Sequence, residues 1–373
     1  MSKRVYLDNN ATTIIDPEVL QVFTSALSSV FGNPSSIHQE GQKARGELHE
    51  ARRQIAKHLK VLPQEIIFTT SATEALNLIL RGFFGYKLQG HVISSTVEHP
   101  AVYGTLKKMM PGVDVTFLTP NSFGSITPDA VLQAIRPDTR LIALMAVNNE
   151  TGVCTNIDAI CDIAEKHRIP CVIDGVALFG KKQFEIRPGC SAMVFSGHKF
   201  HAPKGISFAF IRKSFRFESL LTGGEQEFGR RAGTENVPAC MALAKAVDLA
   251  LKDLETTISR IASLRDYFEQ TLKKALPEIR VNGSGPRVCT TSNIYFPKID
   301  GEALLMYLDL HGVAASMGSA CSTGALEPSR VLLQMGLSRE EAVSSLRFSL
   351  SRFTTKDDID QAIRVIVAGV AIQ

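Results

Sequence analysis

Short apolar runs alternate with longer segments of helical periodicity along the first part of the chain. Apolar runs of this length, rich in β-branched and aromatic residues, are typical of strands inside a sheet. The predicted strands span residues 65–68, 92–94, 115–118, 141–144, 171–173 and 192–195, and the predicted helices between them include 42–59, 73–80 and 157–167. This alternation predicts an α/β fold with a mostly parallel sheet that helices cover on both faces.

The later part of the chain predicts a smaller unit. Residues 239–276 contain neither Gly nor Pro and keep a helical pattern, which predicts one or two long helices that lead out of the larger unit. We expect a large domain at residues 14–255 and a small α/β domain formed by residues 1–13 and 256–373. The last predicted helix begins with the capping pair Thr355 and Asp358 and has an apolar face of Ile359, Ile363, Ile366 and Val367.

Charge, hydropathy and cysteine usage argue against several classes of protein. The formal net charge is only +4 and the basic pairs are scattered, so a nucleic acid is not an expected partner. No apolar run is long enough to cross a bilayer, and the first residues lack the apolar core of a signal peptide, so we expect a cytoplasmic protein with no membrane partner. The seven cysteines include no Cys-x-x-Cys pair, and neither a disulfide framework nor a metal site is predicted.

Ligands of mostly parallel sheets bind at the carboxyl ends of the strands, so the residues that follow the predicted strands are the candidates for a site. After the first strand, Ser71 and Glu74 have the spacing of a capping box, which predicts a helix N-terminus with backbone N–H groups available to a phosphate. Residues 148–152 form a polar turn whose amides suit a ring or a carboxylate. Taken alone, the two segments favour simpler interpretations, a plain helix cap for the first and a simple turn for the second.

Lys199 and Asp174 are a more specific pair, because each follows an apolar strand. Apolar surroundings lower the pKa of a lysine, which makes its amine a nucleophile able to hold pyridoxal 5'-phosphate (PLP) as a Schiff base. A carboxylate at the end of a buried strand needs a partner, and the pyridinium nitrogen of PLP is one. Ser196 and His198 are able to reach the cofactor phosphate, and His99 is able to stack on the ring and move protons.

Each of these residues has a simpler interpretation when it is taken alone. Lys199 is then an ordinary surface lysine, Asp174 an N-cap or a structural ion pair, and His99 a loop histidine without a role. Taken together, the residues favour a PLP enzyme of the aspartate aminotransferase fold type.

Cys321 lies in a run with almost no bulky side chain, residues 316–325. The glycines and hydroxyl residues of this run predict a mobile loop, with a helix that starts near Pro328. A thiol on such a tether is suited to moving into a site and out again, whereas the alternative is a half-buried cysteine in a loop.

A series of motifs occurs in order at residues 6–13, 32–36, 72–74, 147–150, 196–199, 232–236, 318–321 and 347–350. In these motifs the chain resembles the cysteine desulfurases of the class V aminotransferase family. The resemblance implies a homodimer with its site at the subunit interface. It implies that Lys199 forms the Schiff base, that His99 stacks on the pyridine ring and that Asp174 pairs with the ring nitrogen. It also implies that Asn149 contacts the cofactor and, together with Arg347, positions the substrate. The phosphate would be held by Ala72, Thr73, Ser196 and His198 of the same subunit and by Thr234 of the partner subunit.

The reaction implied by the resemblance converts L-cysteine to L-alanine. Lys199 and His99 are the expected proton carriers, and the Cys321 thiolate attacks the substrate sulfur to form a persulfide. The outer sulfur of the persulfide then passes to a sulfur-acceptor protein, which is an iron–sulfur cluster scaffold, a tRNA-thiolation protein or a DNA-modification partner.

Two residues depart from the family pattern. Ala177 stands where a glutamine usually donates a hydrogen bond to the phenolic oxygen of the cofactor, and the loss is worth ~0.5–1.5 kcal/mol if water takes its place. Phe228 stands where an arginine is common. The alternatives to a cysteine desulfurase are a related PLP enzyme, namely a selenocysteine lyase or an aminotransferase, and an impaired homologue that acts as a binding partner.

Overall fold

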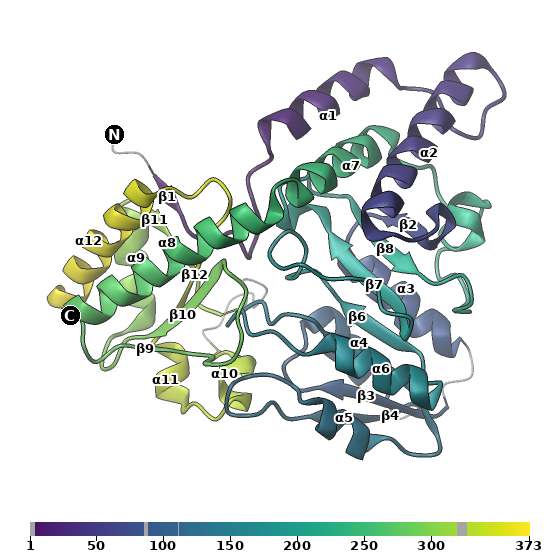
Figure 1. The fold of residues 1–373 in the computed structure, drawn as a ribbon. Coiled ribbons are helices and arrows are strands. Elements are labelled where there is room, and N and C mark those ends of the chain that lie inside the picture. Colours follow the sequence, from purple (N-terminus) through teal and green to yellow (C-terminus); the bar gives the residue numbers. More distant parts are fainter. Residues whose placement is uncertain (1–3, 86–88, 111, 319–326) are drawn as a thin grey trace.

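The computed structural model describes residues 4–85, 89–110, 112–318 and 327–373, and a seven-stranded sheet lies in its larger part (Figure 1). Strand β8 runs antiparallel to both of its neighbours, whereas the other adjacent pairs are parallel. The predicted α/β fold with a mostly parallel sheet is therefore confirmed. In spatial order the strands are β2 (Ile66–Thr69), β8 (Ser207–Ile211), β7 (Cys190–Ser196), β6 (Cys171–Asp174), β5 (Thr139–Met145), β3 (His91–Ser95) and β4 (Asp114–Leu118).

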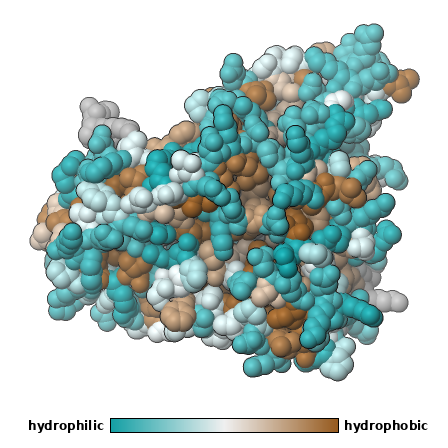
Figure 2. Space-filling view, viewed as in Figure 1, coloured by the Kyte–Doolittle hydropathy of each residue, from teal (hydrophilic) through white to brown (hydrophobic). Residues whose placement is uncertain are grey.

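Helices cover both faces of this sheet, which explains why its central strands are apolar along their whole length. Ile142 and Ile173 face a core shared with α2 (Gln39–Leu59), α6 (Ile157–His167) and α7 (Val237–Leu251). Their neighbours Leu141 and Val172 face the opposite core, shared with α3 (Ala72–Phe84) and α4 (Pro100–Met109). On the outer face drawn in Figure 2, hydrophilic residues predominate and hydrophobic ones are scattered between them.

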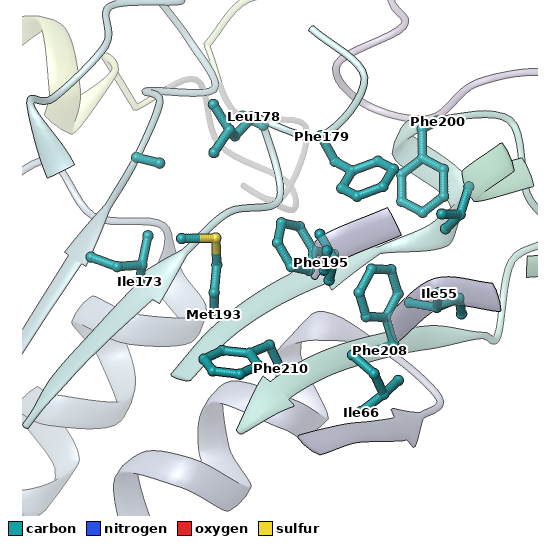
Figure 3. Close-up of a cluster of buried hydrophobic side chains, with 14 of the residues drawn as sticks. Ile55, Ile66, Ile173, Leu178, Phe179, Met193, Phe195, Phe200, Phe208 and Phe210 are labelled. Atoms are coloured by element: carbon teal, nitrogen blue, oxygen red, sulfur yellow. The ribbon is translucent and has the colours of Figure 1, made fainter. Parts of the chain in front are cut away.

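A cluster of aromatic rings fills the core beneath the end of β7 (Figure 3). The ring centroid of Phe179 lies 5.2 Å from that of Phe195 and 4.6 Å from that of Phe200. Phe195 also lies 4.8 Å from Phe208 on β8. A Cβ atom at Gly175 would lie 2.7 Å from the Phe195 ring, so the residue after Asp174 has no room for a side chain. The cluster therefore supports the ends of both β6 and β7.

The helix boundaries agree more closely with the positions of capping groups than with the limits of the apolar pattern. Helix α2 begins at Gln39, before the predicted start at residue 42, because His38 Nδ1 accepts a hydrogen bond from the backbone N–H of Gly41 (3.3 Å). Helix α3 runs on to Phe84. The long segment without Gly or Pro forms two helices, α7 and α8 (Leu254–Ala275), which are separated at Asp253, where φ is +50°.

A second core unites the N-terminal strand with the C-terminal part of the chain. Strands β12 (Ser345–Ser349), β10 (Thr291–Tyr295) and β9 (Arg280–Val281) form an antiparallel sheet, and β1 (Val5–Tyr6) pairs in parallel with β11 (Val313–Ala314). The large side chains of this core include Leu7, Phe268, Phe296, Phe348 and Ile359. The domain limits at residues 14 and 255 stay a prediction.

The final helix α12 (Lys356–Ile372) begins as predicted. The Thr355 backbone N–H donates to Asp358 Oδ2 (2.9 Å), and the Asp358 N–H donates to Thr355 Oγ1 (3.2 Å). Helix α10 (Arg330–Gln334) begins after its cap Ser329, close to the expected position at Pro328. The remaining helices are α1 (Pro17–Ser29), α5 (Pro128–Ala134), α9 (Gly301–Leu310) and α11 (Arg339–Val343). In the described part of the chain, none of the helices combines the length and the apolar character that crossing a membrane requires.

Replacing Phe195 by alanine tests the role of the aromatic cluster. Phe195 is fully buried, so we expect Phe195→Ala to lower the free energy of unfolding by about 3–5 kcal/mol through lost burial and a cavity. Urea unfolding followed by circular dichroism measures the change. The control is Phe123→Ala, at a side chain that is 52 % exposed, where we expect a clearly smaller effect. Equal losses in the two variants would contradict the proposed support of β6 and β7.

Candidate active site

A cavity of about 230 Å³ opens at the carboxyl end of the central strands. Its wall brings together most of the site residues expected from the sequence: Ala72, Thr73, His99, Asn149, Asp174, Ser196, His198, Lys199 and Arg347. Thr234 is exposed and is not among the lining residues. Cys321 and the rest of the segment 319–326 lie outside the described residues.

Lys199 reaches the cavity because the chain turns sharply after β7. Residues Gly197–Lys199 form a single 3₁₀ turn. A Cβ atom at Gly197 would lie 2.8 Å from the carbonyl oxygen of Ile206, so this turn requires glycine. The Lys199 amine donates hydrogen bonds to the backbone carbonyls of Asn10 (2.6 Å) and Ala11 (2.8 Å). The N-terminal segment thus forms part of the site.

Asp174 is a buried carboxyl group at the end of β6, 5 % exposed. Its Oδ1 accepts a hydrogen bond from the backbone N–H of Val176 (3.0 Å). Burial raises the pKa of Asp174, while the nearby His99 and Lys199 oppose that rise. A carboxylate in this position is stabilised by any cation that enters the cavity, so it fits a protonated ring nitrogen.

His99 caps helix α4 and also lines the cavity. Its Nδ1 accepts a hydrogen bond from the backbone N–H of Ala101 (3.1 Å), which assigns the proton of the neutral ring to Nε2. Burial lowers the pKa of His99; Asp174 opposes the shift and Lys199 adds to it. His99 is therefore a neutral imidazole near pH 7 with one N–H to donate.

The first turn of α3 lies in the wall of the cavity. Ser71 Oγ accepts from the Glu74 N–H (3.1 Å), whereas the Glu74 carboxylate binds the N–H of Thr70 (3.0 Å) and Arg231 Nε (2.8 Å). The expected capping box is thus only half formed, because Glu74 reaches one residue further back than Ser71. The first N–H groups of a helix have no partner within the helix, so those of Ala72 and Thr73 suit a phosphate.

Ser196 and His198 continue this polar wall. The Ser207 hydroxyl donates to Ser196 Oγ (3.3 Å), and His198 Nδ1 lies 3.1 Å from Thr12 Oγ1. Burial, with Lys199 next in importance, lowers the pKa of His198 to about 4. His198 therefore acts as a neutral hydrogen-bonding group at neutral pH.

Arg347 on β12 adds a buried cation to the wall of the cavity. It is 1 % exposed, and its two terminal nitrogens donate to Asp8 Oδ1 (2.8 Å) and to the carbonyl oxygen of Asn149 (3.1 Å). Its Nε has no hydrogen-bond partner within the described residues. A guanidinium whose donors are incompletely used suits the carboxylate of a bound ligand.

Three residues of the site were not predicted as site residues from the sequence. Asn10 and Lys181 line the cavity, and Glu98 is buried beside it. Burial raises the pKa of Glu98 to about 8, and its Oε1 accepts from the Ser95 hydroxyl (2.5 Å). The available signals were the position of Glu98 after an apolar strand and the presence of Asn10 in the first family motif.

The two departures from the family pattern have different surroundings. Ala177 lines the cavity and offers no polar side-chain atom there. Phe228 lies away from the cavity, with the Arg52 guanidinium 5.0 Å from its ring centroid, and its φ is +59°. Arg52 also forms a buried two-pronged ion pair with Glu227, at 2.7 Å for each bond.

Comparisons with known proteins agree with this geometry. The family model "Aminotransferase class-V" matches residues 5–362. A cysteine desulfurase of Nostoc sp. is 42 % identical over 97 % of this chain and 92 % of its own length, and "Cysteine desulfurase IscS" of Methanosarcina thermophila is 38 % identical over 98 % and 91 %. A solved "NIFS-like protein" superposes with a TM-score of 0.92 at 31 % identity, covering 99 % of this chain and 100 % of its own. The structure titled "SspA in complex with cysteine" has a TM-score of 0.83 at 32 % identity, covering 94 % and 100 %. The chain therefore belongs to the class V aminotransferase family and, within it, to the cysteine desulfurases.

Proposed function

We propose that this protein is a PLP-dependent cysteine desulfurase that converts L-cysteine to L-alanine and forms a persulfide on Cys321. The observation that carries the proposal is the convergence of Lys199, Asp174 and Arg347 on one cavity. Their amine, carboxylate and guanidinium match the aldehyde and ring nitrogen of PLP and the carboxylate of an amino acid. The relatives named above give no support to the aminotransferase, selenocysteine lyase or impaired-homologue alternatives.

The residues of the cavity fit PLP. Bound PLP withdraws electrons from the α-carbon of an amino acid, which allows the α-proton to leave. Lys199 would hold the cofactor and exchange protons, Asp174 would keep the ring nitrogen protonated, and His99 would lie against the ring. The phosphate would be held by the N–H groups of Ala72 and Thr73, by Ser196 and His198, and by Thr234 of the partner subunit in a homodimer.

Arg347 and Asn149 would bind the substrate. Arg347 is held in place by Asp8, so its guanidinium does not need to be ordered when the substrate carboxylate arrives. The Arg347 guanidinium also donates a hydrogen bond to the Asn149 carbonyl oxygen. This bond connects β12 of the smaller sheet, which carries Arg347, to the loop after β5 of the large sheet, which carries Asn149. The neutral His99 has an Nε2–H to donate, so it would serve first as a proton donor.

Sulfur transfer requires the thiolate of Cys321. It attacks the sulfur atom of the substrate, an S–S bond forms and the C–S bond breaks, and the electron pair of that bond stays with the carbon skeleton, which takes up protons and leaves as alanine. The outer sulfur then passes to an acceptor protein, a cluster scaffold or a thiolation partner. The cytoplasmic location expected from the sequence stays a prediction.

Substitution of Cys321 tests the proposed function. We expect Cys321→Ala to lose persulfide formation and sulfur transfer to an added thiol acceptor while the bound cofactor keeps its absorbance, since Cys321 is not among the residues proposed to hold the cofactor. Mass spectrometry and sulfide release measure the two losses. Cys240→Ala, at a buried cysteine on α7, is the matched control and should retain transfer. Transfer that survives in Cys321→Ala would refute the role of this thiol.

A conservative change of Arg347 tests substrate binding. Arg347→Lys keeps the positive charge but cannot offer a two-pronged contact to a carboxylate. We expect kcat/KM for L-cysteine to fall by about 10–100-fold, mainly through a higher KM, which corresponds to about 1.4–2.7 kcal/mol. Arg280→Lys, at an exposed ion pair with Glu341, is the control. A fall in kcat alone with an unchanged KM would argue against carboxylate binding by Arg347.

A further inference from the structure

Lys181 is a second buried amine in the wall of the cavity. Its residue is 7 % exposed, and its Nζ donates a hydrogen bond to the side-chain oxygen of Asn10 (3.1 Å). Its backbone carbonyl accepts from the Cys289 thiol (3.6 Å). Burying an ammonium group beside a neutral amide is costly, because the amide supplies no full opposite charge. A lysine kept at such a cost is a candidate for a role in the chemistry.

Asn10 connects Lys181 to the reacting end of the site. Its carbonyl oxygen accepts the 2.6 Å hydrogen bond from the Lys199 amine, while its side-chain oxygen accepts from Lys181. Its side-chain nitrogen donates to the Asn149 carbonyl (3.0 Å) and to Thr291 Oγ1 (2.9 Å). Because both ends of its amide are bound, the side chain of Asn10 is held in one orientation. The backbone carbonyl that receives Lys199 is thereby held as well.

The charged surroundings of Lys181 are largely cationic. Burial lowers the pKa of Lys181 to about 7, and the positive charge of Lys199 adds to that effect. Charge interaction is mutual, so a protonated Lys181 disfavours protonation of Lys199 in turn. The titratable or charged groups that interact with Lys181 are Lys199, Arg347, His198, His201 and Cys289.

We propose that Lys181 is a positioning residue for Lys199: it holds Asn10, whose carbonyl oxygen receives the Lys199 amine, and in its protonated form it disfavours protonation of the Lys199 nitrogen. This role requires no contact between Lys181 and the reacting atoms. It acts through Asn10 and through its charge. The inference rests on the proposed function, since it takes Lys199 to be the lysine that bears the cofactor.

The test is a pH titration of the absorbance of the holoenzyme, which follows the proton on the nitrogen between Lys199 and the cofactor. In Lys181→Met we expect the midpoint to rise by about one pH unit, a roughly tenfold gain in proton affinity, because a neighbouring cation is lost. Lys181→Arg should restore the midpoint toward that of the natural protein. Lys182→Met, at the adjacent exposed lysine, is the matched control and should leave it unchanged.

A second variant and a labelling step make every outcome decisive. Lys181→Gln keeps a hydrogen-bond donor for Asn10 but lacks the charge, so the midpoint of its titration should rise by the same amount. This variant replaces Lys181→Met in the test if Lys181→Met does not fold. Borohydride reduction of the natural holoenzyme, followed by peptide mapping, identifies the lysine that holds the cofactor. A label on Lys199 with an unchanged midpoint in both neutral variants would overturn the positioning role, as would a label on Lys181. A label on neither lysine would instead refute the proposed function.

Discussion

The burial of charge at the carboxyl edge of the seven-stranded sheet is the constraint on which the rest of the site depends. Asp174, Lys181 and Arg347 are each less than one-tenth exposed, and they come from or follow strands of two different sheets. Removing each ion from water costs several kcal/mol unless nearby groups compensate. The N-terminal segment provides much of that compensation, since Asp8 pairs with Arg347 and Asn10 accepts hydrogen bonds from Lys181 and Lys199.

This constraint explains why the first residues of the chain cross from the smaller sheets to the large one. Leu7 belongs to the core around β10 and β12, and a few residues later the Thr13 backbone N–H donates to the His198 carbonyl oxygen (2.9 Å). The segment between them forms part of the cavity wall. The site is therefore assembled only when both parts of the chain are folded and in contact, and an anionic ligand would relieve the excess of positive charge that remains inside it.

The sequence predicted the parts of the site that depend on local order. Asp174, Lys199 and His99 were identifiable because each follows a short apolar strand, and the carboxyl ends of parallel strands meet at one edge. The mostly parallel sheet followed from the same apolar pattern, whereas helix starts shifted to capping residues such as His38.

Other parts depend on contacts that a local pattern does not contain. Lys181 is bound to Asn10, which is 171 positions away, so its burial follows from the meeting of two distant segments. In the sequence, Lys181 is only one member of the basic pair Lys181-Lys182, one of several such pairs along the chain. Thr234 is exposed in the single chain, and its predicted contact with the phosphate requires a second subunit. The role of Cys321 rests on the family motif at residues 318–321.

The most direct test of the central claim is to incubate the purified protein with L-cysteine, quantify alanine and map sulfur adducts by mass spectrometry. The account predicts alanine, together with a 32 Da adduct, the mass of one sulfur atom, on the peptide that contains Cys321. It also predicts that the site works with alanine at position 177. A protein that binds PLP but yields neither alanine nor a persulfide would contradict the assignment as a cysteine desulfurase.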